Sequence, residues 1–208
     1  MTASDHTIPL PAILFSAEHI DLSRGGKPVL RDISFTLSKG QATIVRGPNG
    51  VGKTTLLRAA AGFVDCDAGR MKAAASALYN GRGGVKPSLS VDENLKFWAA
   101  LYGATSNDVE HAKSAFELHP VASHLAGELS TGYARRLGLA RLPITKRPLW
   151  LVDEPVASLD DHASALFANS VAQHLQAGGS ALIASHDPIA IADANILTLG
   201  TVRNESSP

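Results

Sequence analysis

The sequence has no excess of either charge and almost no cysteine. Lysine plus arginine and aspartate plus glutamate each number 19 in 208 residues, so the formal net charge is zero. Nucleic-acid-binding domains carry a strongly basic patch or a basic balance, so this composition argues against that class of function. The single Cys66 cannot form an internal disulfide, which is typical of a protein in a reducing compartment.

Long apolar runs are also absent. No stretch approaches the roughly 18 apolar residues that a membrane-spanning helix needs. The N-terminal stretch MTASDHTIPLPAILFS carries Asp5 and His6 where a signal peptide has basic residues, and prolines interrupt its apolar part. We therefore predict a disordered leader over residues 1–11, a tail over residues 201–208 and a cytoplasmic protein that reaches a membrane only by docking on a partner.

Strand-like and helix-like segments alternate along the rest of the chain. Two strands joined by a Gly-Gly-Lys-Pro turn come first, and later apolar strands are each followed by turn residues. Ala163, Phe167, Val171 and Leu175 fall four apart, which predicts one buried helix face. The predicted strands are residues 13–22, 29–37, 41–46, 147–155, 180–187 and 194–200. One predicted helix begins near Lys53, and another runs from Asp160 to Gln176.

Two further segments complete the predicted organisation. Residues 71–80 predict one more strand, although their alanines weaken that prediction. Residues 88–128 carry Leu95, Trp98 and Tyr102 at helical spacing, which indicates a small helical insertion. Buried strands that alternate with helices imply a parallel sheet covered on both faces, so the predicted fold class is α/β.

The stretch GPNGVGKTT matches the phosphate-loop pattern G-x-x-x-x-G-K-[ST], between a predicted strand and a predicted helix. Glycines let consecutive backbone N–H groups converge on phosphate, and the positive end of the helix points at the same charge. Lys53 is expected to reach the β- and γ-phosphates of a nucleotide, and Thr54 to bind Mg²⁺. The predicted nucleotide-binding residues of this loop are Gly47, Pro48, Asn49, Gly50, Val51, Gly52, Lys53, Thr54 and Thr55.

Two carboxylates end the predicted strand PLWLVDEP. Asp153 is expected to hold Mg²⁺ through a bound water, and Glu154 to polarise the water that attacks the γ-phosphate. His186 follows another buried strand, at the carboxyl end where parallel sheets bind ligands. The predicted catalytic residues are therefore Lys53, Glu154 and His186, with Thr54 and Asp153 at the metal. A solvated acidic turn and a structural histidine are the alternative interpretations.

Together these motifs resemble the nucleotide-binding cassette of ABC transporters over about residues 13–200. The segment LSTGYARRLGLARL, residues 129–142, is similar to the family's signature segment, and VASLDD, residues 156–161, resembles its D-loop. The resemblance implies a single ABC ATPase domain over residues 12–200. Such a domain has a P-loop NTPase, RecA-like core, an N-terminal antiparallel β subdomain and a helical subdomain, inserted here at about residues 88–145.

The resemblance also implies that the working unit is a homodimer. In this family the signature segment closes over the ATP held by a second cassette, so Ser130 and Gly132 would contact a γ-phosphate across the dimer. ATP would close the dimer, and hydrolysis would let the two halves part. Taken alone, the segment would rather indicate an ordinary capped helix.

A narrower likeness is to the short cassettes of bacterial cytochrome c maturation. It is carried by GPNGVGKTTLLRAAAG, by LARLPITKRPLWLVDEPVASLD and by the finish at ILTLG. This resemblance implies a peripheral ATPase on the cytoplasmic face of the bacterial inner membrane, bound to integral membrane subunits of a haem-handling transporter complex. The helical insertion is the expected docking surface, although Trp98 and Tyr102 could instead form the core of that subdomain.

The chain departs from the family pattern at three places. Thr131 and Tyr133 replace the Gly and Gln that flank the second signature glycine. No Gln follows the strand after the phosphate helix, where counting back from SVDENL places Gly81. The first hairpin offers Ser23 and Arg24 rather than an aromatic residue, so we expect Arg24 to stack on the adenine.

These departures leave two alternatives open. One is a nucleotide-gated regulatory cassette with little turnover, which the altered signature and the missing Gln favour and the intact Asp153, Glu154 and His186 oppose. The other is the ATPase subunit of a different ABC transporter, for metal ions, lipoproteins or drugs. The sequence does not separate these transporters, because in such systems the membrane subunits meet the cargo.

Overall fold

The computed structural model describes residues 12–81, 84–157 and 159–200. The predicted leader and tail lie outside these residues. Strands and helices alternate as the sequence predicts. The elements in chain order are β1 (Ile13–Arg24), β2 (Lys27–Ser38), β3 (Ala42–Arg46), α1 (Lys53–Ala60), β4 (Ala68–Ala73), β5 (Ser76–Tyr79), α2 (Val91–Tyr102), α3 (Ser106–Ala115), the 3₁₀ turns η1 (His119–Val121) and η2 (Ala126–Glu128), α4 (Thr131–Ile144), β6 (Leu149–Asp153), α5 (Asp161–Gln176), β7 (Ser180–Ala184) and β8 (Asn195–Thr198).

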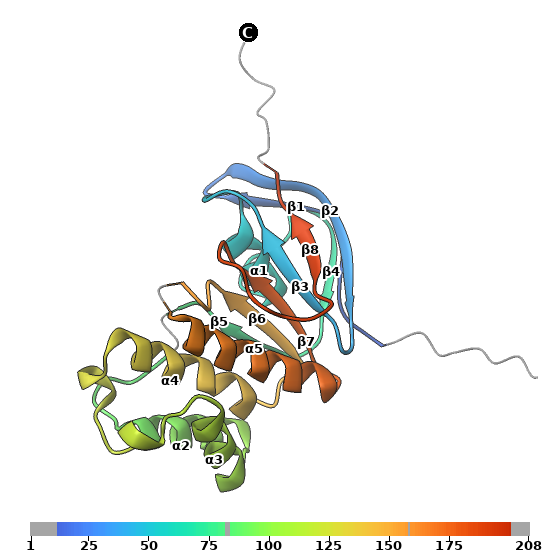
Figure 1. Ribbon diagram of the computed structural model, residues 1–208. Helices are drawn as coiled ribbons and strands as arrows, with labels where there is room; N and C mark the ends of the chain where they lie inside the picture. Colours follow the sequence, from blue (N-terminus) through green and yellow to red (C-terminus); the bar gives the residue numbers. More distant parts are fainter. Residues whose placement is uncertain (1–11, 82–83, 158, 201–208) are drawn as a thin grey trace, which may run out of the picture.

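A parallel sheet with strand order β5-β6-β7-β3-β8 runs through the centre of the molecule (Figure 1). β3, β6 and β7 are apolar and almost wholly buried, which is typical of strands covered on both faces. Successive side chains of a strand point to opposite faces. Leu149 and Leu151 of β6 pack in one core cluster with α1, whereas Trp150 and Val152 pack in the other with α5.

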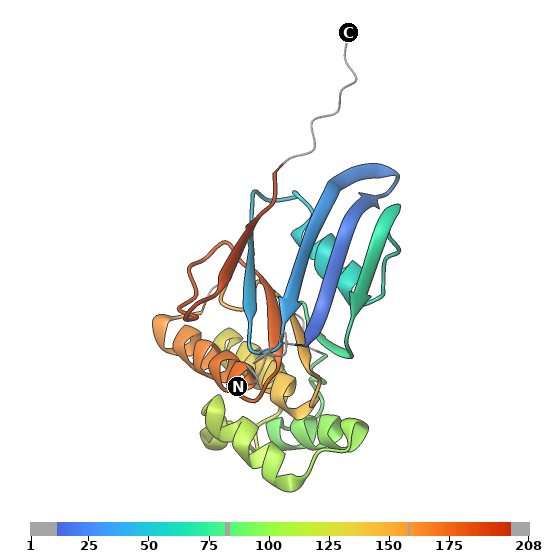
Figure 2. The ribbon, with the colours of Figure 1, turned by 90° about the vertical axis from the view of Figure 1, so that its right-hand side faces the viewer.

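A second, antiparallel sheet has the order β2-β1-β4 and covers the outer side of α1 (Figures 1 and 2). Its buried side chains, such as Phe15 and Leu37, share a core cluster with Leu56 and Leu57 of α1 and with Leu151 of the parallel sheet. α1 is therefore clamped between the two sheets. The predicted fold class, an α/β core with an N-terminal antiparallel β region, agrees with this arrangement.

Residues 71–80 do not form the single strand that the sequence predicts. β4 pairs with β1 at the edge of the antiparallel sheet, and β5 pairs with β6 at the edge of the parallel sheet. Ala74 and Ala75 carry the chain from one sheet to the other. The prediction was wrong because an alanine-rich segment has no periodicity that marks a break, and long-range pairing with β1 and β6 decides where each strand lies.

The helices α2, α3 and α4 pack against one another at the end of the molecule farthest from the antiparallel sheet (Figure 1). α2 begins at a capping box between Ser90 and Glu93, and α3 at one between Thr105 and Asp108. Trp98 is partly buried against the core cluster, and the guanidinium of Arg141 lies over its ring. The boundaries of a separate subdomain, at about residues 88–145, stay a prediction.

Candidate functional site

The predicted phosphate loop connects β3 to α1 at the carboxyl edge of the parallel sheet. Gly47 and Gly52 have φ angles of 147° and 110°, which side chains disfavour. A Cβ at Gly47 would lie 2.7 Å from the carbonyl oxygen of Leu199, and one at Gly52 would lie 3.0 Å from Leu30. The glycines therefore let the loop fold tightly against its neighbours, with the N-terminus of α1 behind it.

Lys53 begins α1 and is only 7% exposed. Its Nζ donates to the carbonyl oxygens of Gly47 at 2.8 Å and Pro48 at 3.3 Å, and it lies 2.6 Å from Nε2 of His186. Among the described residues, no carboxylate pairs with this ammonium group, which can only donate hydrogen bonds. Lys53 thus brings an uncompensated cation to the inside of the loop, which suits an anionic ligand.

Thr54 and Asp153 meet beside this loop, although they are far apart in the sequence. The hydroxyl of Thr54 donates to Oδ2 of Asp153 at 2.7 Å. A hydroxyl and a carboxylate are the oxygen ligands that Mg²⁺ prefers, and the ion usually completes its shell with water and phosphate oxygens. Among the described residues, no group of three or more His, Cys, Asp and Glu could hold a metal ion alone. The pair therefore fits a magnesium ion that is shared with a phosphate ligand.

Glu154 follows β6 in a left-handed backbone conformation, with φ 47°. Its amide donates to the carbonyl oxygen of Ala184 at 2.9 Å, so the end of β7 holds this turn in place. Oε2 of Glu154 accepts from the amide of His186 at 3.3 Å, and Oε1 lies 3.6 Å from Nε2 of the same residue. A positive φ in a residue other than glycine is strained, and this strain is maintained only where the surrounding structure holds the residue in place. Strain of this kind clusters at functional sites.

A cleft of about 200 Å³ opens over these residues. Arg24, at the end of β1, also lines the cleft, and its stacking on a base stays a prediction. Val51 is buried and packs in the core instead. The cleft is lined by Arg24, Asn49, Gly50, Gly52, Lys53, Thr54, Thr55, Asp153, Glu154 and His186.

Ser130 and Gly132 are not part of this cleft. Ser130 is the N-cap of α4, and its hydroxyl accepts from the amide of Tyr133 at 3.4 Å. A Cβ at Gly132 would meet nothing within 4 Å, and the residue has no positive φ. Nothing in the described part of the chain therefore requires glycine at position 132.

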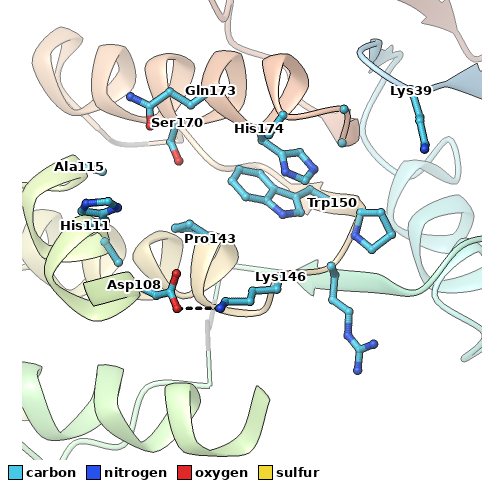
Figure 3. Close-up of a pocket in the computed structure, with 16 residues that line it drawn as sticks. Lys39, Asp108, His111, Ala115, Pro143, Lys146, Trp150, Ser170, Gln173 and His174 are labelled. Atoms are coloured by element: carbon cyan, nitrogen blue, oxygen red, sulfur yellow. Dashed lines mark ion pairs between the residues drawn. The ribbon is translucent and has the colours of Figure 1, made fainter. Parts of the chain in front are cut away.

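A larger hollow of about 530 Å³ lies at the opposite edge of the sheet, between α3, the end of α4 and α5 (Figure 3). There the His174 imidazole stacks on Trp150 with ring centroids 4.0 Å apart, and Lys146 pairs with Asp108 at 2.8 Å. Burial lowers the pKa of His174, which favours the neutral form of its ring. The described residues that line this hollow include none of the predicted site residues, so size alone does not locate the functional site.

One residue at the loop edge is missed by the sequence motifs. Arg46 ends β3 immediately before the loop, and its Nη1 donates to the carbonyl oxygens of Ser185, His186 and Asp187. The only sequence signal is a charged side chain at the end of an otherwise apolar strand. That signal usually indicates a residue that emerges into solvent, so the contact becomes visible only in the structure.

The position of the loop decides the class of the protein. In open α/β sheets, ligands bind outside the carboxyl ends of the strands. Here β6, β7 and β3 are neighbours in the sheet, and each delivers its site residues to that edge. The fold and the site together define a P-loop nucleotide-binding protein.

Known proteins narrow this class further. The family model described as ABC transporter matches residues 30–157. A relative from Ruegeria pomeroyi, named Cytochrome c biogenesis ATP-binding export protein CcmA, is 51% identical over 90% of this chain and 91% of its own. A relative of the same name from Roseobacter denitrificans is 48% identical over 90% and 91%. The solved structure of an ABC transporter ATP-binding protein from Pyrococcus furiosus has a TM-score of 0.79 and 26% identity, over 89% of this chain and 96% of that one.

The chain therefore belongs to the ABC transporter family, and within it to the family of relatives named as cytochrome c biogenesis ATP-binding export proteins. It is an ATP-hydrolysing protein of the ABC type, and members of this family work with membrane subunits. In the part of the chain that the structure describes, no helix is long and apolar enough to cross a bilayer.

Proposed function

We propose that this chain is the ATP-hydrolysing subunit of a cytochrome c biogenesis export complex. It would sit on the cytoplasmic face of the bacterial inner membrane, against integral membrane subunits that handle haem. The names of the relatives at 51% and 48% identity support this assignment. Because those relatives match about nine-tenths of the chain, the likeness extends well beyond the short motifs that all such cassettes share.

The observation that carries the proposal is the contact between Lys53 and His186 beside Glu154. Lys53 exchanges the carbonyl oxygens of its own loop for the β- and γ-phosphate oxygens of ATP, while the loop amides bind the same phosphates. His186 then no longer accepts from Lys53, so its Nε2 can carry a proton and donate it in a hydrogen bond to the γ-phosphate. One movement of the Lys53 side chain thereby brings Lys53 to the phosphates and frees His186 to bond the γ-phosphate.

The attacking water is activated beside the γ-phosphate by Glu154. Thr54 and Asp153, which are joined by a hydrogen bond, would hold Mg²⁺, and the ion would neutralise the charge that develops on the phosphates. Glu154 orients and polarises the attacking water and accepts its proton. The amide of His186 donates to Glu154, and this bond keeps the carboxylate directed at the water.

A complete site requires a second copy of the chain. Ser130 and Gly132 lie outside the cleft of their own protomer, at the exposed N-terminus of α4. Free amides and the helix dipole make such a terminus a site for phosphate. We propose that they close over the ATP of the partner, with glycine at position 132 because a side chain there would meet that nucleotide rather than any part of its own protomer.

The test is performed in a bacterium that lacks its own cytochrome c maturation cassette. Haem-stained c-type cytochromes are measured in cells that express the wild type or Lys53→Ala, together with phosphate release by the purified complex. We expect the wild type to restore the cytochromes and Lys53→Ala to restore neither cytochromes nor phosphate release. Phosphate release without cytochromes would indicate a different transporter. Nucleotide binding without phosphate release would indicate a regulatory cassette.

A further inference from the structure

The guanidinium of Arg46 is enclosed by the main chain that follows β7. Its Nη1 lies 2.9 Å from the carbonyl oxygen of Ser185, 2.6 Å from that of His186 and 2.8 Å from that of Asp187. The register of the parallel strands explains the encounter: Val45 lies opposite Ala184, so the next residue of each strand emerges at the same level. The chain after Ala184 thus curls around the arginine.

Further bonds close this turn. Ser185 is fully buried, its amide donates to the carbonyl oxygen of Val45 at 3.3 Å, and its hydroxyl donates to that of Asp187 at 2.9 Å. Three carbonyl oxygens that converge on one point repel one another, and a part-buried carbonyl such as that of Ser185 is costly without a donor. A cationic donor at their centre removes both penalties, and charge-assisted hydrogen bonds are the stronger kind.

The turn carries His186. The carbonyl of Ser185 and the amide of His186 belong to the same peptide group: the carbonyl accepts from Arg46, and the amide donates to Oε2 of Glu154. The imidazole of His186 reaches Nζ of Lys53. The orientation of one peptide group therefore links the arginine to the proposed catalytic carboxylate. If the carbonyls turned away from Arg46, the amide would turn away from Glu154 as well.

We infer that Arg46 is a positioning residue: through the main chain of residues 185–187 it holds His186 in register with Glu154 and Lys53. The inference rests on the proposed function, because the register of His186 matters for turnover only if this site hydrolyses ATP. In the described part of the chain, the hydrogen bonds of the Arg46 side chain go to carbonyl oxygens of residues 185–187 and not to the phosphate loop. Its loss should therefore affect the rate of hydrolysis far more than the affinity for ATP.

The main test compares Arg46→Met with Arg46→Lys in the full-length protein. Displacing a catalytic group by about 1 Å can cost a hundredfold, so we expect kcat of Arg46→Met to fall about a hundredfold. The KM for ATP should change by less than about threefold, since the phosphate loop is intact. Lysine has three donors on one cation and can bond the same carbonyls, so Arg46→Lys should recover most of kcat. Arg31→Met, at an exposed position of β2, is the matched control and should behave as the wild type.

Ser185→Ala gives a second variant of the same turn, in case Arg46→Met does not fold. It removes only the hydroxyl bond to Asp187, so kcat should fall severalfold while KM stays constant. A wild-type kcat in Arg46→Met, or in Ser185→Ala if the first variant is unfolded, would overturn the inference. A rise in KM that equals the loss of kcat/KM would also overturn it, because Arg46 would then serve nucleotide binding.

A second readout separates this inference from the proposed function. With ¹⁵N-labelled histidine, the imidazole signals of His186 are assigned by comparison with His186→Gln, without added nucleotide. Arg46→Met should shift or broaden these signals, and Arg46→Lys and Arg31→Met should not. If the wild type hydrolyses no ATP, the proposed function fails while this measurement still decides the role of Arg46. Unchanged His186 signals in a folded Arg46→Met would refute the inference.

Discussion

The two regions that we propose to share one ATP differ in how completely the chain constructs them. At the sheet edge, hydrogen bonds join Lys53 to His186, His186 to Glu154, and Thr54 to Asp153. At the start of α4, Ser130 caps only its own helix, and Gly132 faces open space. The first region is preorganised by the fold, whereas the second caps its own helix and takes no part in the cleft of its own protomer. The difference supports our proposal that a second protomer completes the site.

The reason lies in the elements that carry each region. Three adjacent strands end at one edge and leave little freedom to the residues that follow them. α4 lies with α2 and α3 and is tied to the parallel sheet by contacts such as the bond from Arg141 to the carbonyl oxygen of Leu78. A helix terminus that projects from a packed group of helices can approach another molecule without any change at the sheet edge.

Glu154→Gln should have the largest effect and tests the preorganised region. Glutamine keeps the shape and the acceptor for the amide of His186 but cannot take a proton, so kcat should fall about a thousandfold. ATP binding should persist, and the unhydrolysed nucleotide should trap a dimer, detectable by light scattering. Glu18→Gln, exposed on β1, is the control. Hydrolysis at the full rate, or a monomer under saturating ATP, would contradict the proposal.

Gly132→Asp should break the second region alone. The new carboxylate would face the triphosphate across the dimer, and like charges there cost several kcal/mol, so turnover should fall roughly a hundredfold or more. Thermal stability should be unchanged, because the side chain has room and an acidic residue is favourable in the first helical turn. Ser123→Asp adds the same charge at an exposed position of the same region and should have no effect.

Mixing Gly132→Asp with Lys53→Ala sharpens this result. In a heterodimer both lesions fall on one composite site, and the other site combines an intact phosphate loop with an intact signature segment. Activity should therefore reappear when the two inactive proteins are combined. If it does not, the segment does not act across a dimer.

Asp92→Asn tests whether the helical region is stabilised by its charges. Asp92 pairs with Lys113 of α3 at 2.8 Å and with Lys96, and these contacts lower its pKa. A pKa that is lower in the folded state stabilises the protein at pH values above the unfolded-state pKa of about 3.9. This stabilisation is lost as the pH falls through the folded-state pKa. We expect a loss of about 1 kcal/mol at pH 7, since the pair is partly screened by solvent.

Urea unfolding at pH 7 and at about pH 2.5 measures this effect. The difference between Asp92→Asn and the wild type should shrink at the lower pH, because that pH lies below the unfolded-state pKa of about 3.9, where the stabilisation by the lowered pKa of Asp92 begins to be lost. Asp65→Asn, at an exposed site beside the antiparallel sheet, should lower stability by less at either pH. A difference of the same size at both pH values would show that packing, rather than charge, accounts for the role of Asp92.

Arg24→Ala should have the smallest effect. Arg24 lines the cleft at the end of β1, and an exposed cation–π contact contributes about 0.5–1 kcal/mol, so the Kd for ATP should rise about twofold to fivefold. Arg70→Ala, at an exposed position of β4, is the control. Fluorescence titration with an ATP analogue measures both, and an unchanged Kd in Arg24→Ala would refute the stacking role.

The site residues of the sheet edge could be predicted because each belongs to a local pattern. The glycines and Lys53 are adjacent in one loop, and Asp153 and His186 each end an apolar strand. Arg46 could not be predicted, since its partners lie 139 to 141 positions away and are backbone atoms, which carry no sequence signature. The division of residues 68–79 between two sheets could not be predicted for a similar reason, because it depends on pairing with the remote strands β1 and β6.

By itself, the sequence determined that this chain has an α/β fold with a phosphate loop, an acidic strand end and a signature segment, because these features depend on residue type over a few neighbouring positions. Only the tertiary structure decided that His186 bonds to Lys53 and Glu154, that Arg46 holds the turn between them, and that Ser130 and Gly132 remain apart. Those relations follow from strand order and helix packing, where contacts form between segments that are remote along the chain.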